Sequence, residues 1–340
     1  MYSILLILSK FFSTVLAMND PFDRTIDYLR ISVTDRCNLR CRYCMPEKGI
    51  ESLSHTEILR YEEIERIVRA AAKLGVGSVR LTGGEPLVRP GIEDLISAIS
   101  AIDGIEDIAM TTNGLLLEKF APRLADAGLN RVNISLDTLN PERYAYVSRC
   151  GRIEEVFTGI EAALAAGLSP LKINAVIIRG FNDDEIIPLS EWALNNGLNL
   201  RFIEFMPVQD SSMHFDDGFL SSDEIRTVVR DAFPGLGEST ILGSGPSTCG
   251  RVEGRPGSLG IIEAVSHEFC ASCNRIRLTA DGRLRPCLFS DDEVDIKSAL
   301  RNDADDVSDV LLKAVSLKPS SHSGFGKVCR DGRLMHEIGG

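Results

Sequence analysis

The strongest constraint on the fold is an alternation of strand-like and helix-like segments that repeats six times between Asp27 and Pro207. Short apolar runs alternate with segments whose apolar residues recur every three or four positions. The predicted strands are Tyr28–Val33, Ser78–Leu81, Asp107–Met110, Arg131–Leu136, Leu171–Ile177 and Leu200–Phe205. The predicted helices are Tyr61–Leu74, Ile92–Ile102, Leu117–Ala127, Ile153–Ala166 and Glu185–Asn195. Because parallel strands require crossover connections, six such units predict a parallel sheet. Eight would close a barrel, so we expect an α/β fold with an open, partial (βα)6 TIM-type barrel.

The chain changes character after Pro207, where segments rich in Gly, Pro and Ser replace the regular alternation. We therefore expect a barrel domain over residues 18–207 and a C-terminal domain over residues 208–340. Residues 4–17 are mostly apolar, but no basic segment precedes them, and they are shorter than the roughly 20 residues of a membrane span. We interpret residues 1–17 as an over-extended translation start, with a targeting segment as the alternative, and expect no membrane association.

The net charge and the cysteine content argue against a nucleic-acid-binding protein and for a metal-binding one. The net charge of −12 in 340 residues argues against nucleic acid as a partner, so a polyanionic ligand would need a locally basic pocket. Six of the nine cysteines fall into two tight groups, and an odd number cannot pair completely. Such groups favour metal binding over a disulfide framework, and they favour a reducing, cytoplasmic compartment.

The first cysteine group is Cys37, Cys41 and Cys44, directly after the first predicted strand. In a β/α barrel this is the C-terminal face, where active sites lie. A structural zinc site usually takes four ligands, whereas three thiolates on a four-iron cluster leave one iron open. An open iron can chelate the amine and carboxylate of S-adenosylmethionine (SAM). A zinc knuckle or incidental thiols are the alternatives.

This CxxxCxxC spacing, with Tyr43 before the last cysteine, resembles the signature of radical SAM enzymes. Leu81–Pro86 resembles the GGEP motif of that family, in which glycines permit close backbone approach to SAM. The resemblance implies SAM contacts from Tyr43, Gly84, Ser135 and Met206, and Asp137 is a further candidate. Taken alone, the glycine motif would be a βα turn and Met206 a core residue.

The second cysteine group is Cys270, Cys273 and Cys287. Three thiolates again suit a cluster with one open iron, which could hold a substrate, although Cys249 or Cys329 could instead complete a zinc site. Arg275 and Arg277 alternate along an extended segment and so share one face. Arginines there are suited to phosphate or purine recognition.

Both groups together, with an Ile-Gly-Gly end, resemble the GTP 3′,8-cyclase family of molybdenum cofactor synthesis over roughly Arg24 to Gly340. The resemblance implies two [4Fe–4S] clusters, one on each cysteine group. It implies GTP contacts from Arg30, Arg80, Thr111, Lys172, Arg275 and Arg277. The catalytic residues would be Cys37, Cys41, Cys44, Arg275 and Arg277. Independently, Arg30, Arg80 and Lys172 interrupt apolar strands, where a cation facing inward needs an anion.

The family's reaction defines what else is expected. A 5′-deoxyadenosyl radical would abstract the C3′ hydrogen of GTP, and C3′ would attack C8 to give (8S)-3′,8-cyclo-7,8-dihydroguanosine 5′-triphosphate. Expected partners are an electron donor such as flavodoxin or ferredoxin, the downstream cyclic pyranopterin monophosphate synthase, and a second copy of the chain in a homodimer. The tail, Gly339 and Gly340, reaches the active site in the family. The alternatives are another auxiliary-cluster radical SAM enzyme, such as a peptide-modifying maturase, and a non-catalytic zinc-stapled scaffold.

Overall fold

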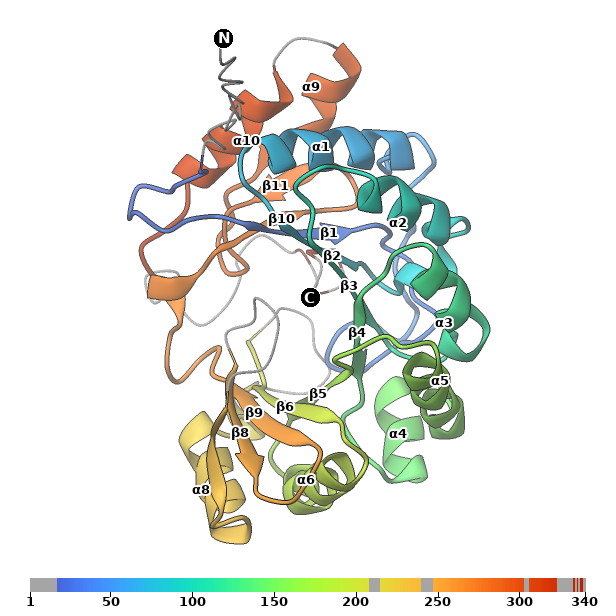
Figure 1. Cartoon of the computed structure of the whole chain (residues 1–340), viewed down its shortest axis with the longest axis vertical. Coiled ribbons are helices and arrows are strands. Elements are labelled where there is room, and N and C mark those ends of the chain that lie inside the picture. Colours follow the sequence, from blue (N-terminus) through green and yellow to red (C-terminus); the bar gives the residue numbers. More distant parts are fainter. Residues whose placement is uncertain are drawn as a thin grey trace, which may run out of the picture.

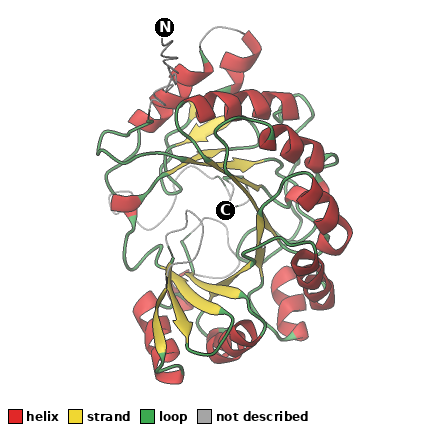
Figure 2. Cartoon of the chain, in the orientation of Figure 1, coloured by secondary structure: helices red, strands yellow, loops and turns green. Residues whose placement is uncertain are grey.

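The computed structural model describes residues 17–207, 215–239, 247–302 and 306–322, together with residues 333, 335, 337 and 338. Within these residues the strands form one 12-stranded sheet in the order β12-β11-β10-β1-β2-β3-β4-β5-β6-β9-β8-β7. The strands lie along an arc with helices on its outer side (Figure 1). Figure 2 shows the same division into an inner strand layer and an outer helix layer.

The six predicted strands are confirmed, and neighbours among them pair in parallel. They are β1 (Tyr28–Ser32), β2 (Ser78–Thr82), β3 (Asp107–Thr112), β4 (Arg131–Ser135), β5 (Lys172–Ile177) and β6 (Asn199–Glu204). The five predicted helices are also present, as α1 (Tyr61–Lys73), α2 (Ile92–Ser100), α3 (Leu117–Asp126), α5 (Ile153–Ala165) and α6 (Ile186–Asn195). The partial barrel expected from the alternation is thus the fold of the chain.

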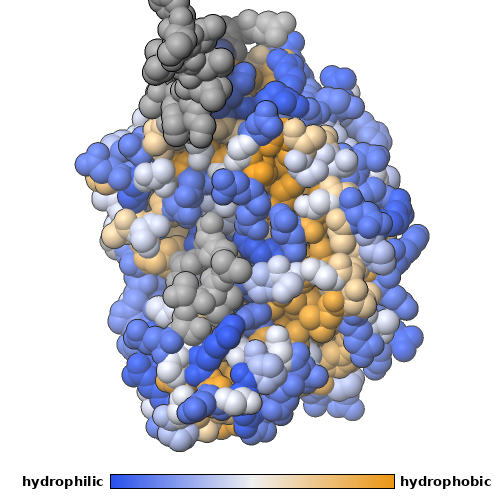
Figure 3. All heavy atoms as spheres, in the orientation of Figure 1, coloured by the Kyte–Doolittle hydropathy of each residue, from blue (hydrophilic) through white to orange (hydrophobic). Residues whose placement is uncertain are grey.

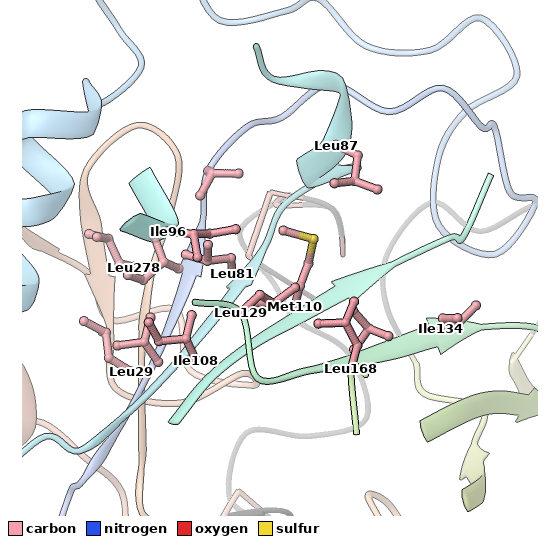
Figure 4. Close-up of a cluster of buried hydrophobic side chains, with 14 of the residues drawn as sticks. Leu29, Leu81, Leu87, Ile96, Ile108, Met110, Leu129, Ile134, Leu168 and Leu278 are labelled. Carbon is pink, nitrogen blue, oxygen red and sulfur yellow. The ribbon is translucent and has the colours of Figure 1, made fainter. Parts of the chain in front are cut away.

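The strand sequences explain which side chains reach the barrel interior. Successive residues of a strand point to opposite faces of the sheet. On β1, Leu29 and Ile31 are fully buried in the apolar core, whereas Arg30 between them faces the interior cavity. Figure 4 shows Leu29 close to Leu81 of β2 and Ile108 of β3 in this core. The apolar face therefore anchors each strand to the helices and leaves the opposite face for function.

Helix α4 (Pro141–Ser148) lies between β4 and α5 and was not predicted. Its start carries clear signals, because Asn140 accepts hydrogen bonds from the backbone N–H groups of Glu142 and Arg143 at 2.9 and 3.1 Å. Pro141 occupies the first helical turn, where a missing N–H costs nothing. This helix packs behind the first cysteine loop.

The C-terminal part of the chain extends the sheet at both edges. Strand β9 (Ser258–Ile262) pairs in parallel with β6, and β10 (Arg275–Leu278) pairs in parallel with β1. The remaining strands are β7 (Leu236–Ser239), β8 (Thr248–Val252), β11 (Arg283–Arg285) and β12 (Val294–Asp295). The remaining helices are α7 (Phe215–Gly218), α8 (Ser222–Ala232), α9 (Lys297–Asn302) and α10 (Val307–Ser316). The division at residue 208, within a stretch outside the described residues, stays a prediction.

The described part of the chain contains no helix long and apolar enough to cross a membrane. Residues 1–16, Cys329 and the Gly339–Gly340 tail lie outside the described residues.

Met18 is buried, and its backbone N–H donates to the Leu74 carbonyl at 3.0 Å. Hydrophilic side chains make up most of the rim of the face seen in Figure 3.

Candidate active site

The first cysteine group lies on the loop after β1, as the sequence predicts. The backbone N–H groups of Arg40 and Arg42 donate to the carbonyls of Ser148 and Val147 at 3.1 and 2.9 Å, so α4 holds the loop from behind. Cys37, Cys41 and Cys44 line one cavity of about 200 Å³, which we call the cysteine-loop cavity. The loop thus presents three thiols to one space.

The half-buried position of these thiols fits a metal site. Burial raises the pKa of Cys37 to about 11 and also raises the pKa of Cys41 well above its ordinary value. Thiolates in such surroundings need a nearby cation, and metal ligation requires the thiolate form. A bound metal ion would make three adjacent thiolates favourable here, and the described cavity lining contains no Lys or Arg that could take its place.

The glycine-rich turn after β2 packs directly against this loop. The backbone N–H of Gly84 donates to the Thr34 carbonyl at 2.8 Å, and that of Glu85 donates to the Arg36 carbonyl at 2.8 Å. A Cβ atom on Gly84 would lie 2.2 Å from the Arg36 carbonyl oxygen. Gly84 is therefore required by the contact between the two loops as well as by its place in the cavity wall.

Two buried carboxylates fix the far wall of the cysteine-loop cavity. Glu85 accepts hydrogen bonds from Thr112 Oγ1 and the Asn113 N–H, both at 2.7 Å. Asp137 accepts from Tyr43 Oη at 2.7 Å and from the Val176 N–H at 2.9 Å. Burial raises the pKa of Glu85 to about 7 and that of Asp137 to about 6.

The predicted SAM residues are brought together by the fold. Tyr43, Gly84, Ser135 and Met206 all line the cysteine-loop cavity, as does Asp137. A third carboxylate, Glu204, lines it as well and accepts from the backbone N–H groups of Val265 and Ser266 at 2.6 and 2.9 Å. An acidic lining without Lys or Arg favours a ligand that carries positive charge, as the sulfonium and amine of SAM do, and such a ligand would in turn favour the ionised form of Glu85 and Asp137.

A second cavity of about 170 Å³ adjoins the first, and we call it the arginine cavity. All three cysteines of the second group line it, together with Arg30, Arg80, Arg275 and Arg277. Thr111, Asn174, Ile203 and Met206 line both cavities and so form their common wall. The predicted SAM and GTP residues therefore lie on two sides of one boundary.

Strand register concentrates positive charge in the arginine cavity. Arg30 on β1 is paired with Arg80 on β2 and with Arg277 on β10, and all face the same space. Burial and then the charge of Arg277 lower the pKa of Arg30 well below its ordinary value, and burial lowers that of Arg277 to about 10. The described lining contains five arginines and no Asp or Glu. An anionic ligand would relieve this repulsion.

Sequence reasoning missed one of these five arginines, Arg201 on β6. Its Nε atom is buried without a hydrogen-bond partner among the described residues, as is the Nε atom of Arg275. The available signal was the one used for Arg30 and Arg80, namely a cation that interrupts an apolar strand. Unpaired buried donors are costly, and because Arg201 and Arg275 line the arginine cavity, a ligand bound there could satisfy theirs.

Lys172 differs from the other predicted GTP residues. Its side chain on β5 is fully buried and is absent from the described lining of both cavities. Burial, followed by the charges of Arg201 and Arg131, lowers the pKa of Lys172 to about 6. Its contact with GTP stays a prediction.

The described cysteines outside the two groups do not complete either one. Cys249 on β8 and Cys150 after α4 line neither the cysteine-loop cavity nor the arginine cavity. The ligand atoms of Glu268, Cys270 and His322 lie within 4.8 Å of one another, so the second group has further donors nearby. A zinc site with Cys249 is not supported by this placement.

Comparison with known proteins agrees with this geometry. The Radical SAM superfamily model matches residues 31–193, and the Molybdenum Cofactor Synthesis C model matches residues 198–324. The GTP 3′,8-cyclases of Pelotomaculum thermopropionicum and Heliobacterium modesticaldum are each 48% identical to this chain, covering 95% of it and 100% of their own length.

Solved structures of more distant proteins agree on the fold. Streptococcus suis SuiB bound to S-adenosylmethionine superposes with a TM-score of 0.63 at 18% identity, covering 84% of this chain and 65% of that one. The protein anSMEcpe with bound AdoMet gives a TM-score of 0.57 at 17% identity, covering 88% and 79%. With the identity and coverage of the two cyclases, these findings show that the chain belongs to the GTP 3′,8-cyclase family of radical SAM enzymes.

Proposed function

We propose that the chain converts GTP to (8S)-3′,8-cyclo-7,8-dihydroguanosine 5′-triphosphate in molybdenum cofactor biosynthesis, using SAM and two [4Fe–4S] clusters. The observation that carries this proposal is the opposite polarity of two adjoining cavities. Among the described side chains, one is lined by three carboxylates and no Lys or Arg, and the other by five arginines and no carboxylate. A cationic cosubstrate and a polyanionic substrate would each meet complementary charge, side by side.

The cysteine-loop cavity would hold SAM. Cys37, Cys41 and Cys44 would hold a cluster, which would supply the electron for reductive cleavage of SAM and so the radical chemistry directed at C3′ of GTP. Tyr43 and Asp137 keep the loop and the end of β4 together, and Gly84 lets the second turn approach the loop closely. Ser135 and Met206 complete the SAM-facing wall.

The arginine cavity would hold GTP. Arg30, Arg80 and Arg277 offer forked donors from three neighbouring strands, which suits phosphate oxygens. Arg201 and Arg275 add buried Nε donors that a ligand would satisfy. Arg80 Nη1 already donates to Thr111 Oγ1 at 3.4 Å, so Thr111 would be oriented at the boundary where the ribose must lie. Cys270, Cys273 and Cys287 would hold the second cluster against the guanine.

Positioning at the common wall would decide the outcome of the reaction. A radical formed in one cavity must reach one carbon of a substrate held in the other. Thr111, Asn174, Ile203 and Met206 form the boundary between these two spaces. Fixed geometry and exclusion of water reduce attack on the protein or on solvent.

We further propose that the enzyme works in the reducing cytoplasm, as a homodimer, with electrons from a flavodoxin or ferredoxin. Its product would pass to cyclic pyranopterin monophosphate synthase. The eight described cysteines are all free thiols, which supports a reducing compartment.

The test is anaerobic turnover. Protein starting at Met18 is reconstituted with iron and sulfide, reduced, and supplied with SAM, and 5′-deoxyadenosine is measured with GTP, with ATP and without nucleotide. We expect strong stimulation by GTP and lower or no stimulation by ATP. Equal amounts under all three conditions would overturn the GTP assignment. Zinc without iron or sulfide would instead support a zinc-stapled scaffold.

A further inference from the structure

Lys318 lies immediately after α10 and is buried beside the second cysteine group, with 4% of its surface exposed. Its Nζ atom donates to the Arg275 carbonyl at 2.7 Å, to the Pro286 carbonyl at 2.9 Å and to Cys273 Sγ at 3.6 Å. An ammonium group carries three donors, and here each has an acceptor. Burying a charge costs free energy unless it is paired. Because all three N–H donors of Lys318 have acceptors, its position beside the cysteines is specifically stabilised.

The three acceptors belong to the two chain segments that carry the cysteines. Arg275 follows Cys273 by two residues, and Pro286 directly precedes Cys287. Between them the chain runs out along β10 and back along β11. The Lys318 side chain, from a third segment, therefore joins the start of β10 to the end of β11, where the thiols of Cys273 and Cys287 face the cavity.

The segment that carries Lys318 is itself fastened to the first loop of the group. Arg24 donates through Nη1 to the Cys270 carbonyl at 2.7 Å and through Nη2 to the Pro319 carbonyl at 2.6 Å. Asp20 Oδ2 in turn pairs with Arg24 Nε at 2.5 Å. Arg24, which precedes β1, thus holds the segment after α10 next to the second cysteine group.

The Lys318 side chain also brings a positive charge to the second cysteine group, because its Nζ atom lies 3.6 Å from Cys273 Sγ. A neighbouring cation favours the thiolate form that metal ligation requires.

We propose that Lys318 is a positioning residue for the second cluster, which fixes the Cys273 and Cys287 segments relative to each other and places a positive charge beside their thiolates. The inference rests on the proposed function, because it takes Cys270, Cys273 and Cys287 as cluster ligands. Partners of metal ligands orient them and tune the bound metal. A cation also stabilises the reduced cluster, which carries one more negative charge.

The test separates the two clusters by mutation. One background removes the first site (Cys37→Ala, Cys41→Ala, Cys44→Ala), and the other removes the second site (Cys270→Ala, Cys273→Ala, Cys287→Ala). Lys318→Met is introduced into both, with Lys313→Met as the matched control, because Lys313 is exposed on the helix that precedes Lys318. Iron retention is measured by chelator competition, and the midpoint potential by EPR-monitored reductive titration.

We expect Lys318→Met to lower the chelator concentration that removes half of the second-site iron by about 10-fold, with no change at the first site. The remaining second cluster should have a more negative midpoint potential, and Lys318→Arg should restore the potential toward that of the parent. Unchanged iron retention and potential would overturn the proposal. Equal loss at both sites would also overturn it, because it would indicate a general folding defect. Failure of both parent backgrounds to bind iron and sulfide would instead contradict the proposed function.

Discussion

Tyr43 Oη donates a hydrogen bond of 2.7 Å to Asp137 Oδ2, which joins the first cysteine loop to the end of β4. Both side chains line the cysteine-loop cavity, and Asp137 Oδ1 accepts from the Val176 N–H of the next strand. The loop that would carry the cluster is thus fixed to the part of the barrel that would carry SAM.

Tyr43→Phe removes this tether and leaves a buried carboxylate oxygen without its donor. Since a hydrogen bond to a charged group contributes about 1.5–3 kcal/mol, we expect SAM to bind roughly 10- to 100-fold more weakly. Equilibrium dialysis of SAM with the reconstituted protein measures this. Tyr146→Phe is the control, because Tyr146 is 52% exposed on α4. SAM affinity equal to that of the parent in Tyr43→Phe would contradict the prediction.

Arg201→Met and Arg131→Met should affect different properties, namely GTP binding and the stability of the ligand-free protein. Arg201 lines the arginine cavity, whereas Arg131 on the neighbouring part of the sheet donates through Nε to Asp107 Oδ1 at 2.9 Å. Losing Arg201 should weaken GTP binding by about 10- to 100-fold through a lost charge-assisted hydrogen bond, without lowering the stability of the ligand-free protein. Losing Arg131 should lower the free energy of unfolding by about 1.5–3 kcal/mol, because it breaks a partly buried, charge-assisted pair with Asp107.

Isothermal titration with GTP and urea unfolding measure the two effects on both variants. If Arg131→Met weakened GTP binding as much as Arg201→Met, the arginine cavity would not be the basis of recognition. If Arg201→Met destabilised the ligand-free protein, its unpaired Nε would not signify a group that awaits a ligand.

Gly84→Ala should disrupt the first site selectively. The added Cβ would lie 2.2 Å from the Arg36 carbonyl oxygen, so the β2 turn and the cysteine loop would have to separate. Overpacking of this kind costs about 1–3 kcal/mol and would displace the loop that carries Cys37. We expect less iron in the first cluster and unchanged iron in the second, measured in the two cysteine-deleted backgrounds. Gly235→Ala is the control, because a Cβ added there would have no neighbouring atom within 4 Å.

The barrel was predictable because its signals are local. Each strand alternates between an apolar residue for the helix layer and a residue for the interior, as Leu29, Arg30 and Ile31 show. The cysteine spacings are local too, and the three thiols of each group do line one cavity. Helix α4 was missed although Asn140 and Pro141 are a clear start signal, because its eight residues show little apolar periodicity.

What the sequence could not supply was the pairing of distant segments. Nothing local indicates that β10 lies beside β1, or that Arg277 therefore lies beside Arg30. The role of Lys318 depends on the same long-range arrangement, since its three acceptors are 45, 43 and 32 residues away along the chain. Strands β7, β8 and β9 were hidden by a Gly- and Ser-rich composition that is typical of loops.

Glu85 should make the stability of the cluster-free protein depend on pH. Burial raises the pKa of Glu85 from 4.5 to about 7 despite hydrogen bonds from Asn113, Thr112 and Leu87. Between these values the folded chain binds a proton that the unfolded chain has released. The stability contributed by this group is therefore present below the lower value and is lost as pH rises through the upper one.

We compare Glu85→Gln with the parent by urea unfolding at about pH 5 and about pH 8. The free energy of unfolding of the parent, relative to the glutamine variant, should fall by on the order of 1–3 kcal/mol over this range. Glu62→Gln, at an exposed position on α1, should show a smaller change in the same comparison. A relative stability that rises with pH for Glu85 would mean that its hydrogen bonds outweigh its burial, and the cavity would then hold a full carboxylate charge at neutral pH.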